Sequence, residues 1–461
     1  MPNEGFPSPH NKDNHQTFFG SSVASSRNAK ILAIVFIVVV LALIVDSMIN
    51  QVSDFLVPQL TSIWGMISFI IIAFVSGIGQ FLILEFIKHR TKDIRCKFLH
   101  IKILHGITTT VQYFLLAVIT ALILEMLLSS KYQTGILITV TIASYSLNIV
   151  TLGLLSKKLF SWYMTNRTSV VVILYAVSFT IAALTSLVAA YKWSLVLTGK
   201  QPEITPQTEV IFPSFEPNSL LQSLTGFYQY SSDISFALIW LATLVLLYHY
   251  RHRVGRTKYW LIMGLPLVYY LSTSIDTIGL YIPKTESEEF FFYLYTSLNS
   301  TAGGVLFGLS FWVTSKNLPH GSIVKDYMII TGYGFVLFFI SDQATLIAAS
   351  YPPFGIATVS FYGLSAYLIF LGLYSTAISV AQDTKFRVFV RKLAKEHSSR
   401  LLDSIGSSEM EFEIQKKVLR LAKINSETME REIGIKSALS ENEVKEYLTE
   451  VINEIKSKQK P

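Results

Sequence analysis

Residues 168–191 read TSVVVILYAVSFTIAALTSLVAAY, a stretch that contains no charged side chain. A helix that crosses the hydrocarbon core of a bilayer needs about 20 consecutive, mostly apolar residues. A charge at the bilayer centre costs at least roughly 3 kcal/mol, so spanning segments exclude charged residues. The stretch therefore predicts a transmembrane helix.

Further apolar windows of similar length surround this one. They lie near 31–49, 60–87, 103–128, 134–155, 233–250, 259–282, 291–313, 327–349 and 355–381. None shows the period-two alternation of a β-barrel strand, whereas a helix satisfies its own backbone hydrogen bonds in lipid. We predict an all-α fold: a multi-spanning transmembrane helical bundle of about ten spans with a cytoplasmic α-helical C-terminal tail.

The first window has a competing interpretation as a cleaved signal peptide. The apolar core of a signal peptide is usually about 7–15 residues long and precedes a cleavage site of small residues. The run from Ile31 to Ile49 is longer and ends in DSMI. We therefore interpret it as an uncleaved first span.

The composition supports a membrane protein over a soluble one. Hydrophobic residues make up 51% of the chain and charged residues 15%, against roughly 25% charged in soluble domains. The net charge of +7 comes from basic residues between the apolar windows, so it predicts membrane orientation rather than nucleic-acid binding. Cys96 is the only cysteine, which excludes an internal disulfide and a cysteine-based zinc site. No cofactor is expected.

Basic residues concentrate in alternate loops. One set of loops carries Lys88, Arg90, Lys92, Arg95, Lys97, Lys102, Lys157, Lys158, Arg167, Arg251, Arg253, Arg256, Lys258, Lys316 and Lys325. The opposite loops carry only Lys131, Lys192, Lys200 and Lys284. The positive-inside rule then places both termini in the cytoplasm. We expect the chain in the plasma membrane. One missed or extra span would move the C-terminus to the other side.

Three parts of the chain differ in composition. Residues 1–29 are polar and predict a disordered cytoplasmic N-terminal tail. Residues 30–382 form the predicted transmembrane domain, and residues 383–461 the predicted cytoplasmic helical tail. The longest outer loop, 192–232, contains an amphipathic stretch near residues 220–228. We interpret that stretch as a short helix in the membrane interface, with an outer lid or sensing surface as the alternative.

Four acidic residues fall toward the outer ends of predicted spans: Asp46, Glu125, Asp276 and Asp342. Carboxylates inside a membrane are expensive, so they are candidate contacts for an ion, a proton or a substrate. Alternatively, each lies near the outer headgroups and is solvated there. Asp276 and Asp342 are the stronger candidates because apolar sequence continues beyond both.

The tail begins with a basic segment that carries Lys385, Arg387, Arg391, Lys392 and Lys395. This segment is a candidate contact for anionic lipid, or simply continues the last span into water.

Two apolar stripes follow in the tail. Ser408 with Glu411 and Ser440 with Glu443 have the spacing of capping boxes at helix starts. The stripes that follow these boxes are Ile414, Val418, Leu421 and Ile424, then Val444, Leu448, Val451 and Ile455. They predict two helices that pack on each other, on another copy of the chain or on a cytoplasmic partner.

Motifs for catalysis are missing from the sequence. It contains no His-Glu-x-x-His zinc motif and no Gly-x-x-x-x-Gly-Lys phosphate loop. The segments around Ser310 and Ser365 are similar to those of intramembrane serine proteases but lack a plausible partner histidine. We therefore predict that the chain is not an enzyme and has no catalytic or metal site.

Several short segments in the last third of the chain carry a resemblance. They are GYGF at 332–335, SDQA at 341–344, YPPFG at 351–355, SVAQD at 379–383 and EIQKKV at 413–418. Through them the chain resembles uncharacterised polytopic membrane proteins of ammonia-oxidising archaea. The resemblance implies a membrane protein with a cytoplasmic tail, and it implies no activity or ligand.

Two functional classes follow from these features. The first is a receptor-like or scaffold protein whose helical tail binds a cytoplasmic protein or a second copy of the chain. The second is a transporter or channel for an ion or small solute that uses the acidic residues in the outer half of the membrane. An intramembrane enzyme is the third alternative.

Overall fold

The computed structural model describes residues 18–167, 169–208, 219–272, 285–319, 322–395, 400–433 and 450–451. Over these residues the chain is helical apart from loops and one small sheet. In that sheet β1 (Tyr132–Gln133) pairs antiparallel with β2 (Glu203–Ile204). The predicted all-α class is confirmed.

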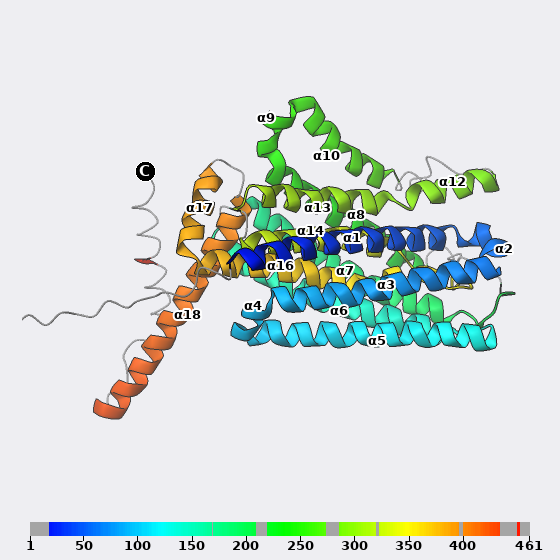
Figure 1. The fold of residues 1–461 in the computed structure, drawn as a ribbon, viewed down its shortest axis with the longest axis horizontal. Helices are drawn as coiled ribbons and strands as arrows, with labels where there is room; N and C mark the ends of the chain where they lie inside the picture. The colour runs from blue at the N-terminus through cyan, green and yellow to red at the C-terminus, as the bar shows by residue number, and fades with distance from the viewer. Residues whose placement is uncertain are drawn as a thin grey trace, which may run out of the picture.

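Long helices run side by side along the bundle (Figure 1). They are α1 (Phe18–Gln51), α3 (Ile63–Arg90), α5 (Leu99–Ser129), α6 (Thr134–Thr165), α7 (Val170–Thr198), α8 (Leu220–Leu247), α14 (Ile323–Gln343) and α16 (Tyr362–Gln382). Two shorter helices are α10 (Arg256–Leu271) and α13 (Asn299–Lys316). The elements that connect them are η1 (Ser53–Leu56), α2 (Val57–Leu60), α4 (Lys92–Lys97), η2 (Tyr248–Tyr250), α9 (Arg251–Val254), α12 (Glu286–Thr296) and α15 (Ile356–Ser360).

The tail forms α17 (Thr384–Lys395) and α18 (Arg400–Ile433). Both lie at one end of the bundle, which we call the tail end (Figure 1). The opposite end, where η1, α2 and the small sheet lie, is called the loop end.

Eight helical segments in the described part of the chain are long and apolar enough to cross a membrane. They are Ala33–Gln51, Ile63–Arg90, Leu99–Ser129, Thr134–Thr165, Val170–Thr198, Leu220–Tyr250, Ile323–Gln343 and Ile356–Gln382. The chain is therefore an integral membrane protein with a multi-spanning helical bundle.

In the described residues, neither of the two other predicted windows is one long helix, and residues 273–282 of the window 259–282 lie outside the description. α10 contains Pro266 and ends at Leu271 after 16 residues, which is about 24 Å, less than the roughly 30 Å hydrocarbon core. Window 291–313 is divided between α12 and α13. The count of about ten spans thus stays a prediction for these two segments.

Helix α8 differs from the expectation for the outer loop. The amphipathic stretch near residues 220–228 is not a separate interfacial helix, because it is the first part of the continuous helix Leu220–Leu247. The Ser219 side chain accepts a hydrogen bond from the backbone N–H of Gln222 at 3.2 Å, so it caps the start of this longer helix.

The last span is the centre of the bundle. Every residue from Ile356 to Ile378 is buried, whereas many residues of α5 are exposed. α16 packs closely on α14, since a Cβ added to Gly372 would lie 2.2 Å from Thr331 Oγ1 and 2.7 Å from the Tyr327 carbonyl oxygen. A small residue here lets the two backbones approach, as in other membrane helix pairs.

Candidate functional site

The chain between α14 and α15 is non-helical and yet mostly buried. Side chains from the loop end satisfy its backbone: Asn50 Nδ2 donates to Phe354 O at 2.7 Å, and the Tyr132 hydroxyl donates to Ser350 O at 2.7 Å. Irregular backbone at membrane depth persists only where protein or water satisfies its polar groups. The helix that follows is itself interrupted at Phe361, between α15 and α16.

Asp46 is fully buried at the end of α1, where it faces the start of α15. Its carboxylate accepts hydrogen bonds from Gly355 N and Thr358 N at 2.9 Å each, and from Thr358 Oγ1 at 2.7 Å. These are the contacts of a capping side chain at a helix start, supplied here by another helix. They favour a capping role over ion binding.

Asp342 belongs to a chain of hydrogen bonds. The Tyr362 hydroxyl donates to Asp342 at 2.9 Å and lies 3.1 Å from Ser186 Oγ. Asn148 Nδ2 donates to Ser186 Oγ at 2.7 Å, and Ser186 shares its hydrogen between Tyr362 and the Ala182 carbonyl. Asn148 is about 20 Å along α6 from its first residue. This series of hydrogen bonds therefore runs from Asp342 near the loop end to Asn148 in the interior of the bundle.

Aromatic side chains lie beside the Asp342–Tyr362 pair, and a buried lysine lies on the neighbouring helix α7. The ring of Tyr145 on α6 lies 4.9 Å from that of Tyr362. Lys192 on α7 is 3% exposed, and its Nζ lies 4.0 Å from the Trp193 ring and 5.3 Å from that of Tyr228. Asp342 and Tyr362 thus lie beside the ring of Tyr145, whereas Lys192 contacts the rings of Trp193 and Tyr228 and has no described contact with Asp342.

Sequence reasoning missed most of these contacts. Lys192 was predicted in an outer loop, because the apolar window ends at residue 191, but α7 continues to Thr198 and buries it. The neighbouring Trp193 could have indicated this position, because an aromatic ring attracts a lysine ammonium and so reduces the cost of burying it. Tyr362 carried no signal in the sequence, because its partners Asp342 and Ser186 belong to other helices.

The described acidic candidates Asp46 and Glu125 have no contact with Asp342 or Tyr362. Asp276 lies outside the described residues. Glu125 is partly buried on α5, and its carboxylate has no hydrogen-bond or ion-pair partner in the described part of the chain. Asp46 and Asp342 contact the interrupted segment at different residues, Thr358 and Tyr362, and do not contact each other. No two of the three described residues, Asp46, Glu125 and Asp342, therefore share a site.

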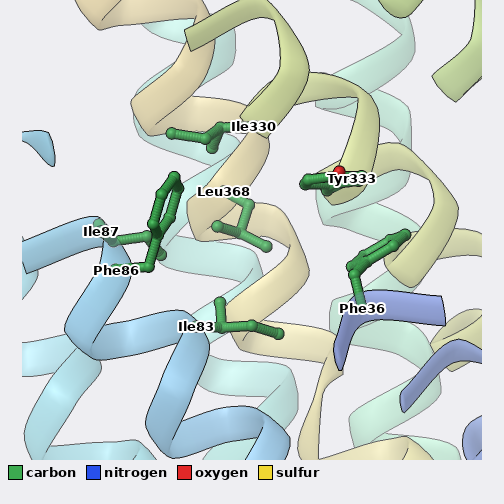
Figure 2. Close-up of a pocket in the computed structure, with 7 residues that line it drawn as sticks. All are labelled: Phe36, Ile83, Phe86, Ile87, Ile330, Tyr333 and Leu368. Atoms are coloured by element: carbon green, nitrogen blue, oxygen red, sulfur yellow. The ribbon is translucent and has the colours of Figure 1, made fainter. Parts of the chain in front are cut away.

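Two hollows in the described part of the bundle are mainly apolar. Figure 2 shows the residues that line one of them: Phe36, Ile83, Phe86, Ile87, Ile330, Tyr333 and Leu368. Its volume is about 20 Å³. That volume is about the size of one water molecule, too small for a solute. The other, of about 360 Å³, lies between α6 and α7 and includes Gly153, Lys157 and Leu187. Neither hollow contains Asp342 or Asp46.

The serines of the protease-like segments bond within their own helices. Ser310 Oγ donates to Phe307 O at 2.6 Å, and Ser365 Oγ donates to Tyr362 O at 2.7 Å. His105 Nδ1 lies 3.0 Å from the Tyr367 hydroxyl. No serine–histidine hydrogen bond joins these residues in the structure as described. Over the same residues, no group of three or more His, Cys, Asp or Glu side chains could hold a metal ion.

The basic segment of the tail divides into two kinds of residue. Arg387 donates to the Ala381 carbonyl at 3.1 Å and also contacts Met410 Sδ, so it links α17 to α18. Arg391 and Lys392 are exposed. The side chains of Lys385 and Lys395 lie outside the described residues. Lipid contact by the exposed pair stays a prediction.

The predicted capping box at Ser408 is wrong. α18 begins at Arg400 and continues through Ser408, whose hydroxyl donates to the Trp162 carbonyl at 3.0 Å. Glu409 is 2% exposed and accepts from Trp162 Nε1 at 2.7 Å, while Lys158 Nζ lies 2.8 Å from the same carboxylate. Tertiary contacts with α6 therefore occupy the side chain that the local pattern assigned to a helix start.

Beyond this anchor α18 leaves the bundle (Figure 1). The exposed apolar residues on this part include Phe412, Ile414, Leu421 and Ile424, the last three being 44%, 58% and 45% exposed. The second predicted stripe and the Ser440 capping box lie outside the described residues, apart from the partly buried Val451.

No protein-family model, no curated protein and no solved structure matches the chain. The likeness to membrane proteins of ammonia-oxidising archaea therefore stays a prediction.

Proposed function

We propose that the chain is a receptor-like or scaffold protein of the plasma membrane that presents the distal part of α18 to a cytoplasmic protein or to a second copy of itself. The observation that carries this proposal is the division of α18 into two parts. Its first part is anchored in the bundle through Glu409, and its distal part exposes Ile414, Leu421 and Ile424. A regular apolar face that the described residues leave uncovered favours a partner surface.

The anchor gives the projecting helix a fixed direction. Lys158 pairs with Glu409 and also lies 4.3 Å from the Phe412 ring and 5.3 Å from the Tyr374 ring. A Cβ added to Gly406 would lie 2.2 Å from Val380 Cγ1, so α18 sits directly on the end of α16. Close packing of this kind holds an element in a single orientation.

The buried helix α16 supports a receptor-like version of this function. It carries Tyr362, which contacts Asp342 near the loop end, and Tyr374, which contacts Lys158 near the tail end. A ligand that binds at Asp342 and shifts α16 would thereby change the packing of α18. Such coupling requires different contacts of the ligand with two states of the protein.

Site-specific photo-cross-linking in cells tests the proposal. A photoreactive residue at Leu421 or Ile424 should give one discrete cross-linked protein, either a partner or a second copy of the chain. Lys423 is exposed on the opposite face of the same helix and is the matched control. The partner is then purified, and its affinity for the chain in nanodiscs should fall at least about tenfold in Leu421→Glu, which is roughly 1.4 kcal/mol. Equal cross-linking at Lys423, or none at Leu421 and Ile424, would contradict the proposal.

Passage of an ion or small polar solute is the second candidate. The hydrogen-bond chain from Asp342 through Tyr362 and Ser186 to Asn148 favours it, because polar groups inside a membrane bundle often mark a pathway. Proteoliposomes tested with H⁺, Na⁺ and K⁺ gradients should show a flux that Asp342→Asn reduces and Glu125→Gln leaves unchanged. An equal flux in protein-free liposomes removes this candidate.

A further inference from the structure

The hollow of about 360 Å³ between α6 and α7 opens on the outer surface of the bundle. Gly153 of α6 is exposed there, and a Cβ added to it would have no neighbour within 4 Å. Ala183 of α7 also lines the hollow. Two small side chains on adjacent helices therefore leave a space that the protein itself does not fill.

The walls of the hollow face away from the core of the bundle. Phe160, Leu184 and Leu187 line it and are 36%, 50% and 54% exposed. All three belong to helices that are long and apolar enough to cross a membrane. Their exposed surface therefore meets lipid rather than water.

The two hydroxyls in the lining already have acceptors within the helix pair. Ser156 Oγ donates to the Ala176 carbonyl at 3.0 Å, and Thr180 Oγ1 donates to the same carbonyl at 2.8 Å. An occupant of the hollow consequently meets mainly apolar surface. Lys157 is the charged group among the described residues that line it.

Lys157 is exposed and has no ion-pair partner in the described part of the chain, whereas the neighbouring Lys158 pairs with Glu409 at 2.8 Å. Lipid chains cannot neutralise an ammonium, and a charge in their midst is unfavourable. An anionic group at this end of the hollow would remove that cost.

The depth of Lys157 suits the headgroup of a lipid. α6 has 32 residues, which is about 48 Å, so a centred helix extends about 9 Å beyond each side of the roughly 30 Å hydrocarbon core. Lys157 precedes the last residue, Thr165, by about 12 Å. Its Cα thus lies about 3 Å inside the core boundary, and the long side chain can place the ammonium among the headgroups.

The length of the hollow suits one leaflet. Its lining on α6 extends from Ile149 to Phe160, which is about 16 Å along the helix or half of the hydrocarbon core. Ile149 lies about 24 Å from the tail end of α6, close to the middle of the bilayer, and Phe160 lies near the core boundary. The hollow therefore covers the depth that one lipid chain occupies.

We propose that this hollow binds an anionic membrane lipid, with one hydrocarbon chain between α6 and α7 and the headgroup phosphate paired with Lys157. The positive-inside rule predicts that the tail end is cytoplasmic, and the cytoplasmic leaflet carries anionic lipids. The charge of Lys157 is thus complementary to the lipids on its side of the membrane.

A second copy of the chain is the other possible occupant, because small residues such as Gly153 and Ala183 also allow membrane helices to approach closely. A spanning helix of that copy would place apolar side chains against Lys157 and separate its charge from the headgroups. This cost favours the lipid.

Photolabelling of the full chain in lipid nanodiscs tests the proposal. The probe is a phosphatidylglycerol that carries a photoreactive diazirine in one acyl chain, and mass spectrometry identifies the labelled residues. Label should concentrate on residues 149–160 and 180–187. Unlabelled phosphatidylglycerol should compete for these residues about fivefold better than phosphatidylcholine with the same chains, which is the effect of one basic residue near an anionic surface. Label spread evenly over the exposed helices, or equal competition by both lipids, overturns the proposal.

The charge contact is tested by Lys157→Gln. This variant should lose the roughly fivefold preference for phosphatidylglycerol at the hollow, while Lys157→Arg should keep it. Lys102→Gln is the matched control, because Lys102 is exposed near the tail end of α5 and does not line the hollow. An unchanged preference in Lys157→Gln, or an equal loss in Lys102→Gln, contradicts the assigned headgroup contact.

The chain contact is tested by Gly153→Leu, whose side chain should fill the hollow and remove most of the label from it. Gly106→Leu is the control, since Gly106 is likewise exposed and has no neighbour within 4 Å of an added Cβ. If Gly153→Leu does not fold, Lys157→Gln on the exposed surface still decides the question. Labelling that persists in a folded Gly153→Leu, or a dimer of the unaltered chain that this variant converts to a monomer, overturns the lipid site.

Discussion

Asp46 of α1 binds Thr358 of α15 twice, through the backbone N–H at 2.9 Å and the hydroxyl at 2.7 Å, although 312 residues separate them. Gly355 N completes the contact at 2.9 Å. The carboxylate thus caps a short helix that belongs to the most buried segment of the bundle.

Removal of this cap should destabilise the protein. Asp46→Ala leaves the buried N–H groups of Gly355 and Thr358 without an acceptor, so we expect the free energy of unfolding to fall by roughly 3 kcal/mol. Asp46→Asn keeps one acceptor oxygen and should lose less. Chemical denaturation in detergent micelles measures both, with Glu125→Gln as the control on α5. A loss of stability in Glu125→Gln as large as that in Asp46→Ala would show that the effect is not due to capping.

Two glycines at different places on the bundle should respond in opposite ways to alanine. Gly372→Ala would put a methyl group 2.2 Å from Thr331 Oγ1, so we expect a loss of roughly 1–3 kcal/mol or more from overpacking. Gly153 has no neighbour within 4 Å of an added Cβ, so Gly153→Ala should be neutral or stabilise by up to about 1 kcal/mol. Thermal unfolding compares the two directly. Equal Tm values would mean that α14 and α16 do not pack as closely as described.

Removal of Glu409 should release α18 from the bundle. The carboxylate accepts from Trp162 Nε1 and pairs with Lys158, and breaking a buried ion pair costs roughly 3–5 kcal/mol. Spin labels on the exposed native Cys96 and on Lys423→Cys should give a narrow distance distribution. Glu409→Ala should broaden it, while Glu427→Ala, on the exposed distal part, should not. A distribution that is already broad before substitution would refute the fixed orientation of α18.

Asp54 should make stability depend on pH. Burial raises the pKa of Asp54 from 3.8 to about 6. The positive charge of Lys200 opposes this rise, and the negative charge of Glu289 adds a smaller rise. A raised folded-state pKa means that the native state binds the proton more tightly than the unfolded state. Proton binding by Asp54 therefore contributes to the free energy of unfolding fully below about pH 4, and this contribution is lost as pH rises through about 6.

The variant Asp54→Asn isolates this contribution. It cannot ionise, so the difference in Tm between variant and unaltered chain should grow in favour of the variant between pH 4 and pH 7. Thermal unfolding over that range measures the difference. A difference that does not change with pH would show that Asp54 is not held in the buried position at η1.

The candidate site shows where sequence reasoning stopped. Asp46 and Asp342 were both predicted as candidate ion or substrate contacts because carboxylates inside a membrane are costly. The structure gives Asp46 three donors from its own chain and gives Asp342 the hydroxyl of Tyr362. A carboxylate in an apolar window indicates that it needs a partner, but the sequence does not show whether that partner is a ligand or another helix.

The tail likewise shows what a local sequence pattern can and cannot predict. The apolar period at Ile414, Val418, Leu421 and Ile424 predicted a helix, and α18 is a helix there. The capping box at Ser408 was wrong because Ser408 and Glu409 bind Trp162 of α6 instead. Local spacing predicts an available cap, whereas contacts with a distant helix decide whether that side chain is used for it.

The sequence by itself determined that this protein is a helical membrane bundle with a helical tail. Apolar length and the exclusion of charge are properties of consecutive residues, and the cost of placing charge or unpaired backbone in lipid acts on each segment separately. Only the tertiary structure decided that the last span is the most buried helix of the bundle, that Asp46 caps α15 and that Lys192 is buried beside aromatic rings. These features depend on atoms that come within about 3–5 Å of each other from helices far apart in the chain, and hydrogen bonds and packing act only over such short distances.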